Sequence, residues 1–193
     1  MKIFARKLGS FLPKEQRVIN QIASMTGSTV SEAIKYYEAV VSFLYDKYRH
    51  KLPRKVEHLL HEFMTRSPKA GQVPIYRGVS MPEIDFNRIK SSKLYQPRSY
   101  SHWSTSKDIA MSYLDERRPN ADRGVNVLFQ CPTAHSGVDL EYIAITTPFG
   151  IEKEVLMPVG ASFKVMSIQE VEPDNNSVSL STDTYYIVKV VES

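Results

Sequence analysis

The sequence has little of what cross-links a chain or anchors it in a membrane. Cys131 is the one cysteine among 193 residues, which excludes an internal disulfide framework and a multi-cysteine metal site. No apolar run is long enough to span a bilayer. The start of the chain is basic, but the apolar segment of a signal peptide does not follow it before Lys14, Glu15 and Arg17. These absences predict a protein that acts in a reducing cytoplasm, unless a signal-independent secretion system exports it, and that has no membrane partner.

The charge is mildly basic and is spread along the chain. There are 25 basic and 21 acidic residues, which give a net charge of +4. This balance suits an anionic ligand. It also allows a nucleic-acid partner but does not favour one, because no arginine-rich block is present. Hydrophobic residues make up 42% and charged residues 24%, as in ordinary globular proteins. We therefore expect one core with a helical extension.

The first third of the chain has the apolar periodicity of α-helices. Residues 13–23 predict a helix that Gly27 ends. Thr29 followed three residues later by Glu32 is a capping box, which begins the strongest helix of the sequence. Its apolar stripe extends this second helix to about residue 49.

A third helix is expected from Pro53 to about residues 67–68. His58 and His61 lie three residues apart on it and could face the same way. The sequence after His61 lacks the second histidine of a zincin helix, and a metal site needs more ligands than these two. We interpret both histidines as residues of the polar helix face and expect no metal.

From residue 69 the pattern changes to that of β-strands. The connection 81–97 is polar and remains unassigned, and 142–146 fits either a strand or the lead-in to a loop. The segments with strand character are 73–79, 99–106, 125–131, 155–158, 162–171 and 185–191. We expect an antiparallel or mixed sheet, because the gaps are too short for repeated helical crossovers. Cys131, at the end of an apolar run, should be buried.

Two glutamates stand out immediately before one of these strands. We expect both glutamates to lie in the strand, where the alternation of side chains places Glu152 and Glu154 on one face while Lys153 points away. Like charges placed so closely disfavour each other's ionisation, and such pairs suit acid–base work or the stabilisation of a cation. The alternative is a solvated strand end with two surface glutamates.

Two further polar features interrupt apolar strands. Arg77 lies inside the run 73–79 and precedes Gly78; such an arginine is costly to bury unless an anion meets it. The alternative is an arginine at a strand end that reaches solvent. Ser104, Thr105 and Ser106 follow the single tryptophan, and a serine-rich strand end with a helix cap at Ser106 also explains them.

The loop 115–124 is charged and contains a proline. Arg117, Arg118 and Arg123 fall within seven positions of it, a density that suits phosphate contacts. They equally fit a solvated face. No Gly-x-Gly-x-x-Gly fingerprint accompanies them, so a Rossmann-type dinucleotide site is not expected.

The order of these motifs is more specific than any one of them. Ile75-Tyr76-Arg77-Gly78, then Trp103-Ser104-Thr105-Ser106, then the segment 152–158 resemble the R-S-E class of mono-ADP-ribosyltransferases. The resemblance covers roughly residues 71–193. Size and the helical first third look most like the small, arginine-specific phage enzymes of the Alt/Mod type, and bacterial toxin domains are similar too.

The resemblance implies an α+β ADP-ribosyltransferase fold. Its core would be a split mixed or antiparallel β-sheet around an NAD cleft, formed by residues 71–193. Residues 1–70 would be a helical region packed on that core. NAD would be a consumed cosubstrate, and no metal would be required.

The resemblance also assigns roles to the motif residues. Glu154 would hold the ribose 2'-hydroxyl and stabilise the oxocarbenium-like transition state, and Ser104 would orient Glu154. Glu152 would orient or deprotonate an acceptor guanidinium. Arg77 would bind the phosphates of NAD, and Gly78 would let the backbone approach the nicotinamide carboxamide.

Five further residues receive supporting roles by the same resemblance. Thr105 and Ser106 would support the strand and the start of the next helix. Arg117 or Arg118 would assist at the pyrophosphate, and Phe149 would contact the acceptor protein.

The resulting prediction is a mono-ADP-ribosyltransferase acting on arginines of intracellular, host bacterial proteins, such as the transcription or translation machinery, with release of nicotinamide. An NAD glycohydrolase and transfer to nucleic acid are the enzymatic alternatives; Glu152 argues against the first. A catalytically dead binding module should have lost Arg77, Ser104 or Glu154, and all three are present. A basic nucleic-acid-binding protein without catalysis would need a recognition module, and the sequence shows none.

Overall fold

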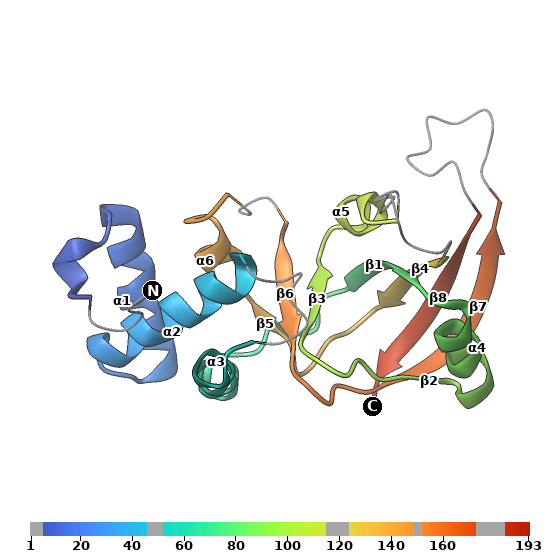
Figure 1. Cartoon of the computed structure of the whole chain (residues 1–193), viewed down its shortest axis with the longest axis horizontal. Coiled ribbons are helices and arrows are strands. Elements are labelled where there is room, and N and C mark those ends of the chain that lie inside the picture. Colours follow the sequence, from blue (N-terminus) through green and yellow to red (C-terminus); the bar gives the residue numbers. More distant parts are fainter. Residues whose placement is uncertain (1–5, 46–51, 115–123, 149–151, 173–183) are drawn as a thin grey trace. The chain divides into compact units, whose positions relative to one another are not determined.

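A computed structural model describes residues 6–45, 52–114, 124–148, 152–172 and 184–193 (Figure 1). Contacts divide the chain into two compact units. The first contains Met1–Lys69 and Val138–Glu152, and the second contains Ala70–Gly137 and Lys153–Ser193. A single boundary at residue 70 is predicted from the sequence, whereas the contacts group 138–152 with the helical unit.

The first unit is mainly helical, as the periodicity of its sequence predicts. Its elements are the 3-10 helix η1 (Leu8–Ser10), α1 (Pro13–Thr26), α2 (Val30–Tyr45), α3 (Arg54–Arg66), the short strand β5 (Val138–Asp139) and α6 (Glu141–Ala144). The larger apolar side chains of the three long helices that have no exposed surface are Ile19, Ile22, Val40, Leu44, Leu60 and Phe63. These side chains belong to the core of the helical unit.

Local chain signals fix where these helices begin and end. Gly27 adopts the left-handed conformation (φ 64°) and ends α1. At the start of α2, the Thr29 N–H donates to Glu32 Oε2 (2.8 Å), and the Glu32 N–H donates to Thr29 Oγ1 (3.3 Å). The predicted capping box is therefore confirmed. The expected continuation of this helix to residue 49 lies outside the described residues.

The histidines of α3 are exposed, which confirms their predicted place on the polar face. His58 Nε2 lies 3.6 Å from Glu62 Oε1, one helical turn further on. No group of three potential metal ligands occurs among the residues that the structure describes. Within the same part of the chain, no helix is both long and apolar enough to cross a membrane.

The second unit is built on a mixed sheet with the strand order β2-β7-β8-β4-β1-β3-β6. Its elements are β1 (Ile75–Met81), α4 (Glu83–Ser92), β2 (Leu94–Tyr95), β3 (Ser101–Ser104), α5 (Lys107–Ser112), β4 (Val125–Cys131), β6 (Glu154–Met157), β7 (Phe163–Val171) and β8 (Tyr185–Glu192). Strands β4 and β8 pair in parallel, and β1 pairs antiparallel with both β3 and β4. The predicted mixed sheet is confirmed.

The structure assigns two segments that the sequence leaves open. The unassigned connection 81–97 contains α4 and β2. The segment 142–146 is not a strand, because α6 begins at Glu141, whose N–H donates to Asp139 Oδ1 (2.8 Å). An aspartate that accepts from a first-turn N–H favours a helix start, and this outweighs the β-branched residues that follow.

The main core of the second unit covers one face of the sheet. Tyr95 stacks on Phe129 with ring centroids 3.9 Å apart, and Trp103 lies 4.9 Å from Phe163. Cys131 joins this core and is 1% exposed, as predicted. Helix α5 packs on the opposite face of β1 and β4, through Ala110 and Leu128.

Candidate active site

Strands β3 and β6 bring Ser104 and Glu154 together. The two residues are direct cross-strand partners, and so are Trp103 and Val155. Directly paired residues point to the same face of a sheet. Trp103 and Val155 belong to the main core, so Ser104 and Glu154 lie on the other face. Both are nevertheless buried, with 5% and 2% of their surface exposed.

Within the described part of the chain, only one oxygen of the Glu154 carboxylate has a hydrogen-bond partner. His102 Nδ1 and Glu154 Oε1 form a short hydrogen bond. With the carboxylate ionised, Nδ1 is the donor of this bond, because a carboxylate can only accept. Oε2 is buried and has no hydrogen-bond partner among the described residues. A buried acceptor without a donor costs free energy, and this position is therefore suited to a ligand that supplies one.

His102 is the functional candidate that the sequence analysis missed. It lies two positions before Ser104 on β3, so the period of two places both side chains on the same face. That spacing is the signal that could have found it.

Glu152 does not lie on the same strand as Glu154. Strand β6 begins at Glu154, and Lys153 before it has a positive φ of 46°. The carbonyl of Lys153 accepts a hydrogen bond from the Thr105 N–H (3.0 Å). This left-handed residue interrupts the alternation. The prediction that one strand carries both glutamates is therefore wrong, and Glu152 is a partly exposed residue outside β6.

Arg77 points away from the face that carries Glu154. Its neighbour Tyr76 pairs with Ser104, so alternation places the Arg77 side chain on the core side of β1. There Arg77 Nη1 donates to the hydroxyl of Tyr95 (2.5 Å). Burial raises the pKa of that hydroxyl, and the guanidinium acts in the opposite direction. The structure thus brings Ser104 and Glu154 together. The third motif residue, Arg77, is instead hydrogen-bonded to the buried Tyr95.

Gly78 has a packing role that the sequence did not indicate. A Cβ at this position would lie 1.8 Å from the backbone oxygen of Ala110 in α5. No side chain fits such a gap. The glycine therefore allows α5 to lie directly on β1. This packing role is independent of the backbone contact with nicotinamide that the resemblance implies for Gly78.

The Ser-Thr-Ser run forms the turn from β3 into α5. Ser106 is the N-cap residue of α5, but its side chain makes no capping hydrogen bond. Instead, the Ser106 N–H donates to Ser104 Oγ (3.0 Å). Together with the bond from the Thr105 N–H to Lys153, this holds the turn against the start of β6. Arg117, Arg118 and Phe149 lie outside the described residues.

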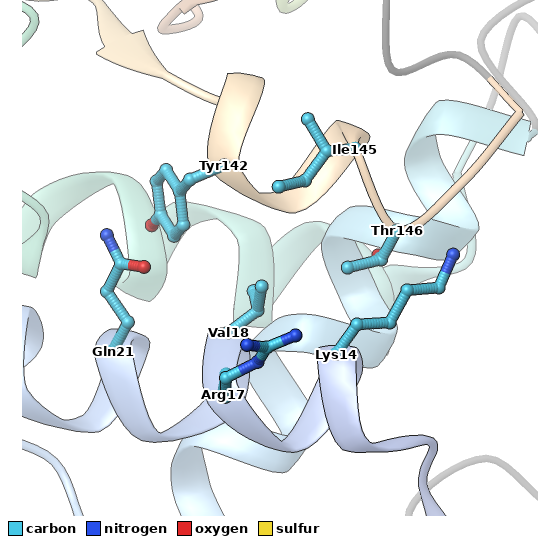
Figure 2. A pocket seen from close by; sticks show the side chains of 7 residues that line it. All are labelled: Lys14, Arg17, Val18, Gln21, Tyr142, Ile145 and Thr146. Carbon is cyan, nitrogen blue, oxygen red and sulfur yellow. The ribbon is translucent and has the colours of Figure 1, made fainter.

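A separate cavity lies in the helical unit (Figure 2). Its volume is about 210 Å³. It is lined by Lys14, Arg17, Val18 and Gln21 of α1 and by Tyr142, Ile145 and Thr146. Two cations and no carboxylate line it, yet none of the predicted site residues does. The buried Glu154 is thus a better candidate for chemistry than this hollow.

The arrangement on β3 and β6 can stabilise positive charge. Glu154 is a fixed carboxylate in a buried place, where the effective dielectric constant is lower than in water. One of its oxygens is held by His102, and the other has no donor among the residues that the structure describes. Preorganised charge of this kind acts most strongly on a cation that develops during a reaction.

Comparison with solved structures identifies the architecture. The C3 exoenzyme of Clostridium limosum aligns with a TM-score of 0.59 at 12% identity, covering 97% of this chain and 95% of that protein. Exoenzyme S of Pseudomonas aeruginosa, bound to carba-NAD and human 14-3-3 protein beta, gives 0.57 at 15% identity, with 91% and 88% covered. The chain has the ADP-ribosyltransferase fold. This confirms the predicted fold class.

A third structure with this fold shares the full length of the chain. The ADP-ribosyltransferase Vis, a toxin of Vibrio splendidus, was solved in complex with agmatine; it gives a TM-score of 0.54 at 16% identity, with 100% and 90% covered. The shared fold therefore includes the helical first third, which carries none of the motifs. No protein-family model matches the sequence, and no curated protein matches it.

Proposed function

We propose that the protein is a mono-ADP-ribosyltransferase that cleaves NAD and transfers ADP-ribose to arginine side chains, releasing nicotinamide. The observation that carries the proposal is the buried Glu154 opposite Ser104, with Oε2 unpaired among the described residues, within the ADP-ribosyltransferase fold. A ribose hydroxyl is a donor of the kind that Oε2 requires. Because this oxygen is buried, NAD binding has to open access to it.

Cleavage of the bond between nicotinamide and ribose depends on Glu154. When the bond between nicotinamide and ribose breaks, the bonding electrons leave with neutral nicotinamide, and C1' of the ribose becomes cationic. A carboxylate beside the ribose stabilises this charge more strongly in the transition state than in the ground state. Ser104, the buried cross-strand partner, supports the position of Glu154.

Glu152 is the proposed base for the acceptor. A guanidinium is protonated at neutral pH and must lose a proton as its nitrogen bonds to C1'. Glu152 would receive that proton. The agmatine complex of Vis supports an arginine-like acceptor, because agmatine carries the same guanidinium group. The acceptors would be intracellular host proteins, as for an enzyme of the phage Alt/Mod type.

Arg77 is proposed to bind the phosphates of NAD. Only one of its N–H groups donates to Tyr95, and a guanidinium has five. Because the Arg77 side chain lies on the core face of β1, binding NAD would require the remaining donors to reach the pyrophosphate from that face. Arg117 or Arg118 would assist there, and Phe149 would contact the acceptor.

An NAD glycohydrolase is the second candidate function. Water would then attack C1' in place of the guanidinium. The observation that favours it is that Glu152 lies outside β6, so the geometry of Glu154 does not depend on it.

A transfer assay tests the proposal and separates the two candidates. The protein is incubated with NAD labelled in the adenylate group, with and without agmatine, and then with a bacterial lysate. Labelled ADP-ribosyl-agmatine and labelled lysate proteins are expected. Free labelled ADP-ribose alone would favour the glycohydrolase. Absence of nicotinamide release in all three incubations would refute both.

A further inference from the structure

The histidine beside Glu154 has no assigned part in the chemistry described above. Its Nδ1 is hydrogen-bonded to Oε1, while Oε2 is the oxygen that the proposed reaction uses. Glu154 is 2% exposed at its side chain and His102 is 28% exposed. His102 is thus the partly solvated member of the pair. It contacts Oε1, the oxygen that the proposed reaction does not use.

We propose that His102 is a positioning residue that fixes the rotation of the Glu154 carboxylate so that Oε2 faces the ribose. This inference rests on the proposed function. The terminal torsion of a glutamate is broad, so the backbone of β6 alone does not set the direction of its two oxygens. A donor held on Oε1 sets that direction. Ser104 Oγ already accepts from the Ser106 N–H, which ties that side chain to the turn.

The fold makes this pairing possible through the strand register. His102 pairs with Leu156, and Ser104 pairs with Glu154. His102 and Glu154 are therefore diagonal neighbours on the same face, within reach for a side chain of this length. The imidazole is rigid and has two torsions, so it holds the carboxylate at little entropic cost.

A positioning role predicts a particular kinetic signature. Rotation of the carboxylate would lower its ability to stabilise the developing cation, while NAD would still be held by its other contacts. Loss of the donor should therefore lower kcat for nicotinamide release by about 10- to 100-fold and leave KM for NAD within about threefold. A merely structural role would instead lower the unfolding temperature and the amount of active protein.

Two substitutions at this position separate the donor from the bulk of the side chain. His102→Asn keeps an N–H donor at the same number of bonds from Cα as Nδ1. His102→Leu keeps the volume and removes the donor. His58→Ala is the matched control, because it removes a histidine from a His–Glu pair on an exposed helix face.

The experiment measures steady-state nicotinamide release and thermal unfolding for the wild type and the three variants. We expect His102→Leu to lose kcat as stated, His102→Asn to recover most of it, and His58→Ala to match the wild type. Equal kcat in His102→Leu and the wild type, or no recovery in His102→Asn, would overturn the inference. If the wild type releases no nicotinamide, the proposed function itself fails, which is a separate result.

Discussion

Ser104 and Glu154 are cross-strand partners on β3 and β6, and both are buried on the face opposite the main core. Glu152 is excluded from this pairing because Lys153 turns the chain with a positive φ. One glutamate is therefore fixed by the sheet, while the other precedes it in a turn. This separation gives the two carboxylates different environments, and different roles are expected of them.

The first prediction concerns Glu152. In Glu152→Gln, transfer of ADP-ribose to agmatine should fall by about 100-fold or more, because the base for the guanidinium is lost. Nicotinamide release in the absence of agmatine should stay within a few fold of the wild type, since Glu154 is untouched. Both products can be quantified in one chromatographic run. Undiminished transfer to agmatine would remove Glu152 from the mechanism.

A second prediction separates the observed partner of Arg77, the Tyr95 hydroxyl, from its proposed ligand, NAD. Arg77→Leu should raise KM for NAD by about 10-fold, the value expected for one lost charge-assisted hydrogen bond. Tyr95→Phe removes the hydroxyl that accepts from Arg77 but leaves the guanidinium, so KM should stay unchanged. Initial rates over a range of NAD concentrations distinguish these results. An unchanged KM in Arg77→Leu would mean that Arg77 serves the fold alone.

Gly78 gives a prediction about stability. In Gly78→Ala the new methyl group would meet the backbone oxygen of Ala110 at 1.8 Å, so α5 would have to move. We expect a loss of about 1–3 kcal/mol in the free energy of unfolding, measured by urea denaturation. Gly9→Ala is the control, because nothing lies within 4 Å of a Cβ at that position. Equal stability of the two variants would contradict the close approach of α5.

The helical unit should show a pH dependence through Tyr37. Burial raises the pKa of its hydroxyl to about 12, and the hydroxyl donates to Glu15 Oε1 (3.1 Å) and lies 2.9 Å from Thr146 Oγ1. An unfolded tyrosine ionises near pH 10. The folded-state pKa is the higher one, so this stabilisation is complete below about pH 10 and is lost as the pH rises toward 12.

The Tyr37→Phe variant isolates that contribution. At neutral pH it should be less stable than the wild type by about 1 kcal/mol, because the hydrogen bonds of the hydroxyl are lost. The difference in the free energy of unfolding between the wild type and Tyr37→Phe should narrow between pH 10 and 12. Only the wild type has this hydroxyl, and its stabilising contribution is lost over that range. Denaturant unfolding at several pH values provides the measurement. A difference that widens over this range would contradict the assigned direction.

Much of the fold could be predicted from local signals. Gly27 and the Thr29–Glu32 capping box mark helix ends through backbone chemistry that the sequence states directly. The three motifs in their order indicated the ADP-ribosyltransferase fold. Helix α4 was not predicted, because Phe86 and Ile89 are its only buried residues and give a weak apolar stripe.

The geometry of the candidate site was harder to predict. Lysine has no preference for positive φ, so nothing in the sequence showed that Lys153 would end the alternation between Glu152 and Glu154. The direction of Arg77 depends on the pairing of β1 with β3 and β4, which is a tertiary feature. His102 could have been found, because its spacing from Ser104 is a strand period.

Nicotinamide release from NAD by Glu154→Gln, set beside the wild type, tests the central claim most directly. The variant should lose about 100-fold or more in kcat, because an amide cannot stabilise the developing cation as a carboxylate does. It should still fold, since the amide oxygen of a glutamine can accept the hydrogen bond from His102 Nδ1, and thermal unfolding checks this. Glu57→Gln, on the exposed face of α3, should behave as the wild type. Undiminished release of nicotinamide by a folded Glu154→Gln protein would contradict the account.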